Sequence, residues 1–152
     1  MIRLRAAERP DLPAIERLLT ANDLPTAGVR DHLAGFLVAE AEGQIVGAAG
    51  LEVYGRAALL RSVVVDGGYR GRGLAGRFVR ALLGSASERG LDRVFLLTTG
   101  AAGYFRRHGF DAIPRAELPA SLSASKELQD GLCDTAQAMT LRLPHPSQGG
   151  HR

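Results

Sequence analysis

Glycine and arginine crowd one short segment of the chain, residues 67–73, which contains four glycines and two arginines. An apolar run ends at Val65 before this segment, and apolar residues at helical spacing begin at Leu74 after it. The first N–H groups of a helix have no partner inside the helix, and together with the helix dipole they bind anions. Glycine lets the backbone approach a ligand closely, and arginine adds fixed positive charge. The segment therefore predicts a phosphate-binding turn, and the alternative is a surface connection with solvated arginines.

Two common phosphate-binding motifs are absent from the sequence. No Gly-Lys-Ser/Thr is present, which argues against a nucleoside triphosphate P-loop. No Gly-x-Gly-x-x-Gly follows the first apolar segment, which argues against a dinucleotide-binding fold.

Glu52 and Arg61 are charged residues inside apolar, strand-like runs, where a lone charge is costly to bury. If residues 55 and 56 form a two-residue turn, Glu52 lies opposite Leu59 and diagonal to Arg61, within reach of a long side chain. The pair could be purely structural. Alternatively, Arg61 could hold an anionic group of a substrate while Glu52 takes the proton of an amine or anchors it.

The pattern of apolar residues predicts the elements that position these groups. Alternation and apolar runs predict strands, and spacing of three and four predicts helices. The expected strands are 2–6, 36–40, 44–54, 57–65, 94–98, 110–113 and 136–143. The expected helices are 12–22 with Asp11 as N-cap, a short one near 29–33, 74–89 with Gly90 as C-cap, 101–108 and 119–129. Short turns at 42–43 and 55–56 join three strands into an antiparallel meander, so the fold class is α/β (α+β) with a mixed sheet.

Composition bounds the class of protein. The chain has 152 residues, 45% of them hydrophobic, which suits one domain with one core over residues 1–143. No apolar run is long enough to span a membrane, the N-terminus has no signal-peptide pattern, and a cytoplasmic location is expected. Aromatic residues are only 5%, which argues against a nucleic-acid partner, and residues 144–152 are expected to be a disordered tail. Cys133 is the single cysteine, so no disulfide within the chain and no metal site are expected.

Two motifs resemble those of the GNAT superfamily of N-acetyltransferases. Arg70, Gly73 and Ala75 match, in register, the family's Arg/Gln-x-x-Gly-x-Gly/Ala. The sequence Phe105-Arg106-Arg107-His108-Gly109-Phe110 is similar to its aromatic-x-x-x-Gly-Phe. The resemblance implies a mixed, mainly antiparallel sheet of about six or seven strands flanked by helices, with acetyl-CoA as co-substrate. It also allows a homodimer, as in many relatives.

The resemblance also implies where acetyl-CoA lies. The pyrophosphate would bind the glycine-rich turn, and the pantetheine arm would follow the backbone of the fourth strand. The thioester would lie in a wedge where the fourth and fifth strands splay apart, with Thr98 lining it on the substrate side. The expected coenzyme A residues are Val63, Val64, Val65, Arg70, Gly71, Arg72, Gly73, Leu74, Ala75, Gly76, Thr99 and Phe105.

The general acid is where the sequence departs from the family. Many members have a tyrosine four residues before the glycine of Gly-Phe, and here Phe105 stands at that position. Phe105 cannot give a proton to the leaving thiolate. The adjacent Tyr104 could act as the acid or could merely pack, and the thiolate could leave unassisted; His108 is a weaker candidate, expected to be exposed.

A narrower resemblance is to the arsenic-resistance subgroup of GNAT proteins. It rests on Gly50-Leu51-Glu52-Val53-Tyr54-Gly55, Leu59-Leu60-Arg61-Ser62, Leu96-Leu97-Thr98-Thr99 and Arg115-Ala116-Glu117-Leu118-Pro119. It implies acetylation of the amine of a small amino-acid-like toxin, such as a phosphinothricin or arsinothricin analogue, with Arg61 and Arg30 as partners of its acid groups. The Cys-Pro and second cysteine expected of the subgroup are missing, so Cys133 is expected to be a buried or idle thiol and not an arsenic ligand.

Three functions remain open on the sequence alone. The first is N-acetylation of a small-molecule amine, which the two motifs favour. The second is a non-catalytic acyl-CoA-binding regulatory module, which Phe105 favours. The third is acetylation of a protein, for which the sequence offers no acidic peptide groove.

Overall fold

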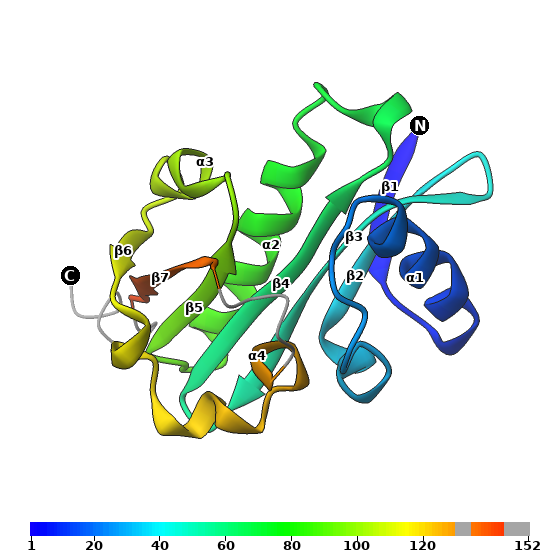
Figure 1. Cartoon of the computed structure of the whole chain (residues 1–152). Coiled ribbons are helices and arrows are strands. Elements are labelled where there is room, and N and C mark those ends of the chain that lie inside the picture. Colours follow the sequence, from blue (N-terminus) through cyan, green and yellow to red (C-terminus); the bar gives the residue numbers. More distant parts are fainter. Residues whose placement is uncertain (130–134, 145–152) are drawn as a thin grey trace.

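A computed structural model of the chain describes residues 1–129 and 135–144, with Gln129 described by its backbone alone. Its strands form a seven-stranded sheet in the order β1-β2-β3-β4-β5-β7-β6 (Figure 1). All neighbours pair antiparallel except β4 and β5, which are parallel. The strands are β1 Ile2–Ala6, β2 Phe36–Ala41, β3 Gln44–Tyr54, β4 Ala57–Val65, β5 Arg93–Thr98, β6 Asp111–Ile113 and β7 Gln137–Arg142. The mixed, mainly antiparallel sheet predicted from the sequence is confirmed.

Helices cover both faces of this sheet. The α-helices are α1 Leu12–Ala21, α2 Leu74–Glu88, α3 Ala102–Arg106 and α4 Lys126–Gln129, and short 3-10 turns occur at Arg9–Asp11, Arg30–Gly35, Gly67–Tyr69, Arg115–Glu117 and Ala120–Ala124. One core cluster joins the sheet to α2 through Phe78, Val79 and Leu82. A second cluster joins it to α1 through Ile15 and Leu19. Val38 and Ala39, successive residues of β2, belong to different clusters, so α1 and α2 lie on opposite faces.

Two predicted elements differ in detail. Asp11 does not cap α1 with its side chain, because a 3-10 turn precedes the helix and the Asp11 carboxylate accepts the Glu8 N–H at 2.7 Å and two bonds from Arg5. The helix predicted over 119–129 is two pieces, a 3-10 turn and α4, separated by Ser125 in an extended conformation. Of the tail predicted over 144–152, only Pro144 is described, and its carbonyl accepts a hydrogen bond from the Ser87 hydroxyl. Residues 145–152 and Cys133 lie outside the described residues.

The hairpin between β3 and β4 has the predicted register. Tyr54 pairs with Ala57 and Glu52 pairs with Leu59, so Gly55 and Arg56 form the two-residue turn. Gly55 has φ +64°, the left-handed conformation that such a turn requires and glycine adopts at little cost. This register places Glu52 and Arg61 on the same face of the sheet.

A β-bulge in β4 was not predicted. Gly50 pairs with Arg61 but Ala48 pairs with Val64, so β4 carries one extra residue between these pairs. Ser62 has φ +62°, uncommon for any residue but glycine. Before the bulge Ala58 and Leu60 pack in the α2 cluster, whereas after it Val65 does. The bulge therefore reverses the alternation of side chains along β4: even-numbered residues face α2 before it, and odd-numbered residues face α2 after it.

The parallel pair is short. Only Ala57, Ala58 and Leu59 of β4 pair with β5, opposite Arg93, Val94 and Phe95. Beyond these pairs the two strands separate, and β4 from Leu60 onward leaves one edge without a strand partner among the described residues. The splay implied by the family resemblance is therefore confirmed. No described helix is long and apolar enough to cross a membrane.

Candidate active site

A cavity of about 570 Å³ occupies the wedge between β4 and β5. Its floor and walls come from both strands, from the connection after α1, from α3 and from α4. The lining residues include Leu60, Arg61, Ser62, Val63, Leu97, Thr98, Thr99, Ala101, Tyr104, Phe105 and Glu127. Thr98, Thr99 and Phe105, which the resemblance placed here, do line this wedge cavity.

A second cavity, of about 380 Å³, lies over the glycine-rich turn and the start of α2. It is lined by Val63, Val65, Tyr69, Arg70, Gly71, Gly73, Leu74, Ala75, Gly76 and Tyr104. Val63, Ala75 and Tyr104 line both cavities. The turn and the wedge are therefore adjoining parts of one elongated site.

The turn exposes the N–H groups at the start of α2. Gly73 is the N-cap residue at φ +75°, and no side chain caps the helix there. The first helical bond runs from Arg77 N–H to Gly73 C=O at 3.1 Å, so the preceding N–H groups make no intrahelical bond. Gly71 also has a left-handed φ of +81°, which a residue with a Cβ rarely adopts. These groups can receive a phosphate without rearranging the helix.

The two arginines of the turn are placed differently. Arg70 donates from Nε to the Val65 carbonyl at 3.1 Å and from Nη2 to the Asn22 side chain, and it lines the turn cavity. Arg72 is exposed, does not line either cavity, and lies over the Tyr69 ring with Cζ 5.0 Å from its centroid. Arg70 is therefore held beside the cavity, whereas Arg72 lies at its rim.

One predicted coenzyme A residue has its side chain on the other face. Val64 is 4% exposed and packs in the α1 cluster, because it follows the bulge on the face opposite α2. Only its backbone is available to a ligand in the wedge. Asn22, Tyr69 and Glu127 also line these cavities and were not predicted. Asn22 and Glu127 lie far from the motifs in sequence, and Tyr69, although it directly precedes Arg70, matches no position of the motif.

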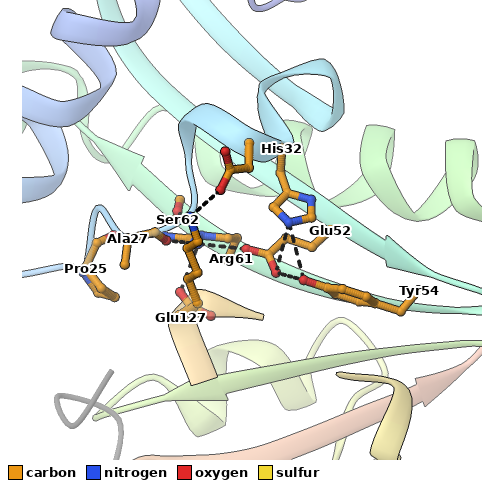
Figure 2. A network of polar contacts seen from close by, with 10 residues as sticks. Pro25, Ala27, His32, Glu52, Tyr54, Arg61, Ser62 and Glu127 are labelled. Atoms are coloured by element: carbon orange, nitrogen blue, oxygen red, sulfur yellow. Dashed lines mark hydrogen bonds and ion pairs between the residues drawn. The ribbon is translucent and has the colours of Figure 1, made fainter. Parts of the chain in front are cut away.

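A buried network of polar groups lies on the wall of the wedge (Figure 2). The side chains of Arg61 and Glu52 are both 0% exposed, and Arg61 Nη1 donates to Glu52 Oε2 at 2.7 Å. The guanidinium also donates to the backbone carbonyls of Ala27 at 2.5 Å and Pro25 at 3.0 Å, and from Nε to Ser62 Oγ at 2.8 Å. Arg61 thereby fixes the connection after α1 to β4.

Glu52 is enclosed on its other side as well. Tyr54 donates its hydroxyl to Glu52 Oε1 at 2.5 Å, and His32 Nε2 lies 3.8 Å from the same oxygen. Burial acts to raise the pKa of Glu52, but the hydrogen bonds from Tyr54 and Arg61 outweigh it and hold this pKa below its ordinary value. Burial, with the Glu52 carboxylate beside it, raises the pKa of Tyr54 to about 12.

This geometry bears on the predicted catalytic role of Glu52. Its carboxylate does not line the wedge cavity, since Arg61 stands between it and the open space. Its lowered pKa and its partners on both oxygens favour a structural carboxylate that holds Arg61. The arrangement therefore favours the structural alternative for Glu52 over a base or amine anchor that contacts the acceptor.

Tyr104 stands where the two cavities meet. Its hydroxyl lies 3.7 Å from the position that a Cβ on Gly76 would occupy, so it faces the first turn of α2. Burial raises the pKa of Tyr104, opposed by the nearby charges of Arg80 and Arg107, and the phenol keeps its proton at neutral pH. Phe105 packs edge-on against Tyr104 and Phe110 and contributes only apolar surface.

Two further predictions are corrected by their positions. His108 is half-buried, with its ring centroid 4.9 Å from that of Tyr104, rather than exposed at the helix end, and burial lowers its pKa. Arg30 lines a separate cavity of about 430 Å³ with Arg9 and Leu12, and does not line the wedge cavity. Neither residue belongs to the site between β4 and β5. Among the described residues no three His, Cys, Asp or Glu side chains gather as a metal-binding group.

The fold and the site define a class of protein. In this class a mixed sheet has two parallel strands that splay apart beside an anion-binding helix N-terminus, and the resulting site can hold a long ligand with phosphates at one end. The chain belongs to the Acetyltransferase (GNAT) family, whose sequence model matches residues 2–110. That match covers both motifs recognised in the sequence.

Relatives support this membership. The chain is 31% identical over 90 residues to an uncharacterized N-acetyltransferase, CT2212, of Chlorobaculum tepidum, and the match covers 59% of this chain and 57% of that protein. The structure of Rv2747 from Mycobacterium tuberculosis in complex with CoA and NLQ is similar at TM-score 0.77 and 26% identity, covering 93% and 99% of the two chains. N-acetylglutamate synthase from Neisseria gonorrhoeae, complexed with coenzyme A and N-acetyl-glutamate, shares the fold at TM-score 0.81 and 21% identity, covering 95% of this chain and 36% of that one.

Proposed function

We propose that the protein transfers the acetyl group of acetyl-CoA to the primary amine of a small molecule. The observation that carries the proposal is the continuity of the anion-binding turn with the wedge cavity through Val63, Ala75 and Tyr104. A ligand with phosphates at one end and a reactive thioester at the other fits this arrangement. The complexes of Rv2747 and of N-acetylglutamate synthase with coenzyme A add support.

The chain's own residues divide the binding of acetyl-CoA between them. The N–H groups at residues 74–76 and the Arg70 guanidinium would receive the pyrophosphate. In the part of the chain that the structure describes, the backbone of β4 after the bulge has no partner strand on the β5 side, so its groups at residues 63–65 would be available to the amides of the pantetheine arm. The thioester would then lie between β4 and β5, beside Thr98 and Thr99.

The reaction needs a neutral amine in contact with the thioester carbon. The amine nitrogen attacks the carbonyl carbon and forms the C–N bond, the C–S bond breaks, the thiolate leaves with the electron pair, and the nitrogen gives its proton to a chain of solvent water. Holding both reactants in one wedge supplies much of the rate by proximity. Tyr104 is the acid candidate for the thiolate, since it borders both cavities and its phenol stays protonated.

The chemical class of the acceptor amine is suggested by the sequence and by one related complex. The sequence resemblance suggests an anionic amino acid such as a phosphinothricin or arsinothricin analogue, and the N-acetyl-glutamate in the synthase complex supports an amino-acid acceptor. Such an acceptor needs a cation for its acid group. Arg61 is the only arginine or lysine lining the wedge among the described residues, and it already donates four hydrogen bonds to protein acceptors. A panel of acceptors must therefore cover both signs of charge.

A thiol-release assay tests the proposal, with acetyl-CoA and a panel of amino acids and amine antibiotics. Amine-dependent release of coenzyme A, with acetylated amine as product, is the expected result. Tight binding of acetyl-CoA without release for any amine would instead support the regulatory acyl-CoA-binding module, which Phe105 at the usual acid position favours.

A further inference from the structure

The elongated site formed by the turn cavity and the wedge cavity carries opposite charges at its two ends. Arg70 lines the turn cavity at the coenzyme A end. At the other end, away from Arg70, the lining includes Glu127 of α4, whose side chain is 9% exposed. An acceptor entering at this end meets the Glu127 carboxylate.

Glu127 is part of the Arg61 network but differs from Glu52 in position. Its Oε2 lies 3.5 Å from Arg61 Nε, whereas Glu52 Oε2 lies 2.7 Å from Arg61 Nη1 (Figure 2). Glu52 is shielded from the cavity, and Glu127 lines it. Of the two carboxylates that share Arg61, only Glu127 can therefore contact a ligand in the wedge.

Among the described residues of the Arg61 network, the carboxylates of Glu52 and Glu127 outnumber the one guanidinium. One guanidinium serves two carboxylates, Glu52 and Glu127, and no other arginine or lysine lines the wedge cavity among the described residues. The neighbouring Lys126 is exposed and pairs with Asp31 at 2.7 Å on the surface. A partly desolvated site with excess negative charge favours a cationic ligand and disfavours an anionic one.

We infer that Glu127 binds an ammonium group of the acceptor other than the neutral amine that attacks the thioester, and that the acceptor has no acid group beside its amine. This inference rests on the proposed acetyl transfer and specifies its second substrate. Arg61 is then a positioning residue that holds the Glu127 carboxylate at the cavity wall. Glu52, on the side of Arg61 away from the cavity, balances the charge of the guanidinium.

Putrescine and L-glutamate are the probes, and Glu127→Gln is the variant. Charge-assisted contacts are the stronger class of hydrogen bond, so Glu127→Gln should lower kcat/KM for putrescine about tenfold or more with an unchanged KM for acetyl-CoA. Glu127→Asp keeps the charge and should retain the wild-type preference for putrescine over L-glutamate. Asp31→Asn is the control, since it removes a carboxylate from an exposed pair with Lys126 and does not alter the cavity lining.

Calorimetric titration of putrescine into the protein–CoA complex separates this inference from the proposed reaction. If no amine releases thiol but putrescine binds the wild type and not Glu127→Gln, the amine site stands and the reaction fails. The inference is overturned if the wild type neither binds nor acetylates putrescine, if it prefers L-glutamate, or if Glu127→Gln leaves the preference between the two probes unchanged.

Discussion

Replacing Glu52 by glutamine would remove one charge from a pair in which both side chains are 0% exposed. Arg61 would keep its carbonyl and hydroxyl acceptors but lose its closest carboxylate, at 2.7 Å. Breaking a buried ion pair by removing one partner costs about 3–5 kcal/mol, and the amide oxygen of glutamine retains one acceptor. We therefore expect the free energy of unfolding to fall by about 3 kcal/mol. In a chain of this size that corresponds to a melting temperature lower by roughly 6–12 °C.

The dependence on pH gives the same variant a second test. The pKa of Glu52 is lower in the folded protein than its ordinary value of 4.5. The carboxylate therefore contributes stability that is fully present above about pH 4.5 and is lost as the pH falls through the folded pKa. The stability difference between wild type and Glu52→Gln should stay constant above about pH 5 and shrink in more acidic solution.

Urea unfolding over a series of pH values measures this difference. Asp31→Asn is the matched control, because it breaks an exposed pair with Lys126 and should leave the melting temperature nearly unchanged. If Glu52→Gln is no less stable than Asp31→Asn, or if its deficit persists undiminished in acid, the pair does not hold the wall of the wedge.

Three more substitutions test other parts of the site. Gly73→Ala should weaken coenzyme A binding in calorimetry, because a residue with a Cβ pays about 1–2 kcal/mol to keep the left-handed φ of +75° at the helix start. Gly43→Ala is the control: at φ +77° in another turn, it should lower the free energy of unfolding by a similar amount and leave the affinity for coenzyme A unchanged. Tyr104→Phe should lower kcat about tenfold or more with an unchanged acetyl-CoA KM if the phenol protonates the thiolate, and an unchanged kcat would show that the thiolate leaves unassisted. Arg30→Ala should leave the KM of every acceptor unchanged, because Arg30 lines a different cavity, and a raised KM would return it to the acceptor site.

Local sequence signals accounted for the hairpins and for the turn. The short β3–β4 connection at Gly55 and Arg56 set the register that brings Glu52 beside Arg61. The glycines before Leu74 indicated the helix start and its left-handed backbone. In each case the residues that determine the structure are neighbours in sequence.

The bulge at Ser62 and the acceptor wall were beyond such signals. A serine within an apolar run does not predict a left-handed φ of +62°. The bulge at this serine determines on which face of the sheet the Val64 side chain lies. Glu127 meets Arg61 only because α4 folds back over the sheet from far along the chain. The insertion of β7 between β5 and β6 is likewise a non-local pairing.

A crystal structure of the protein with acetyl-CoA bound tests the central claim most directly. The pyrophosphate should lie against the N–H groups at residues 74–76 with Arg70 beside it, and the thioester should lie between β4 and β5 next to Thr98. Acetyl-CoA bound elsewhere, for example with its phosphates at Arg9 and Arg30 in the separate cavity, would contradict the assignment of the wedge as the site of acetyl transfer.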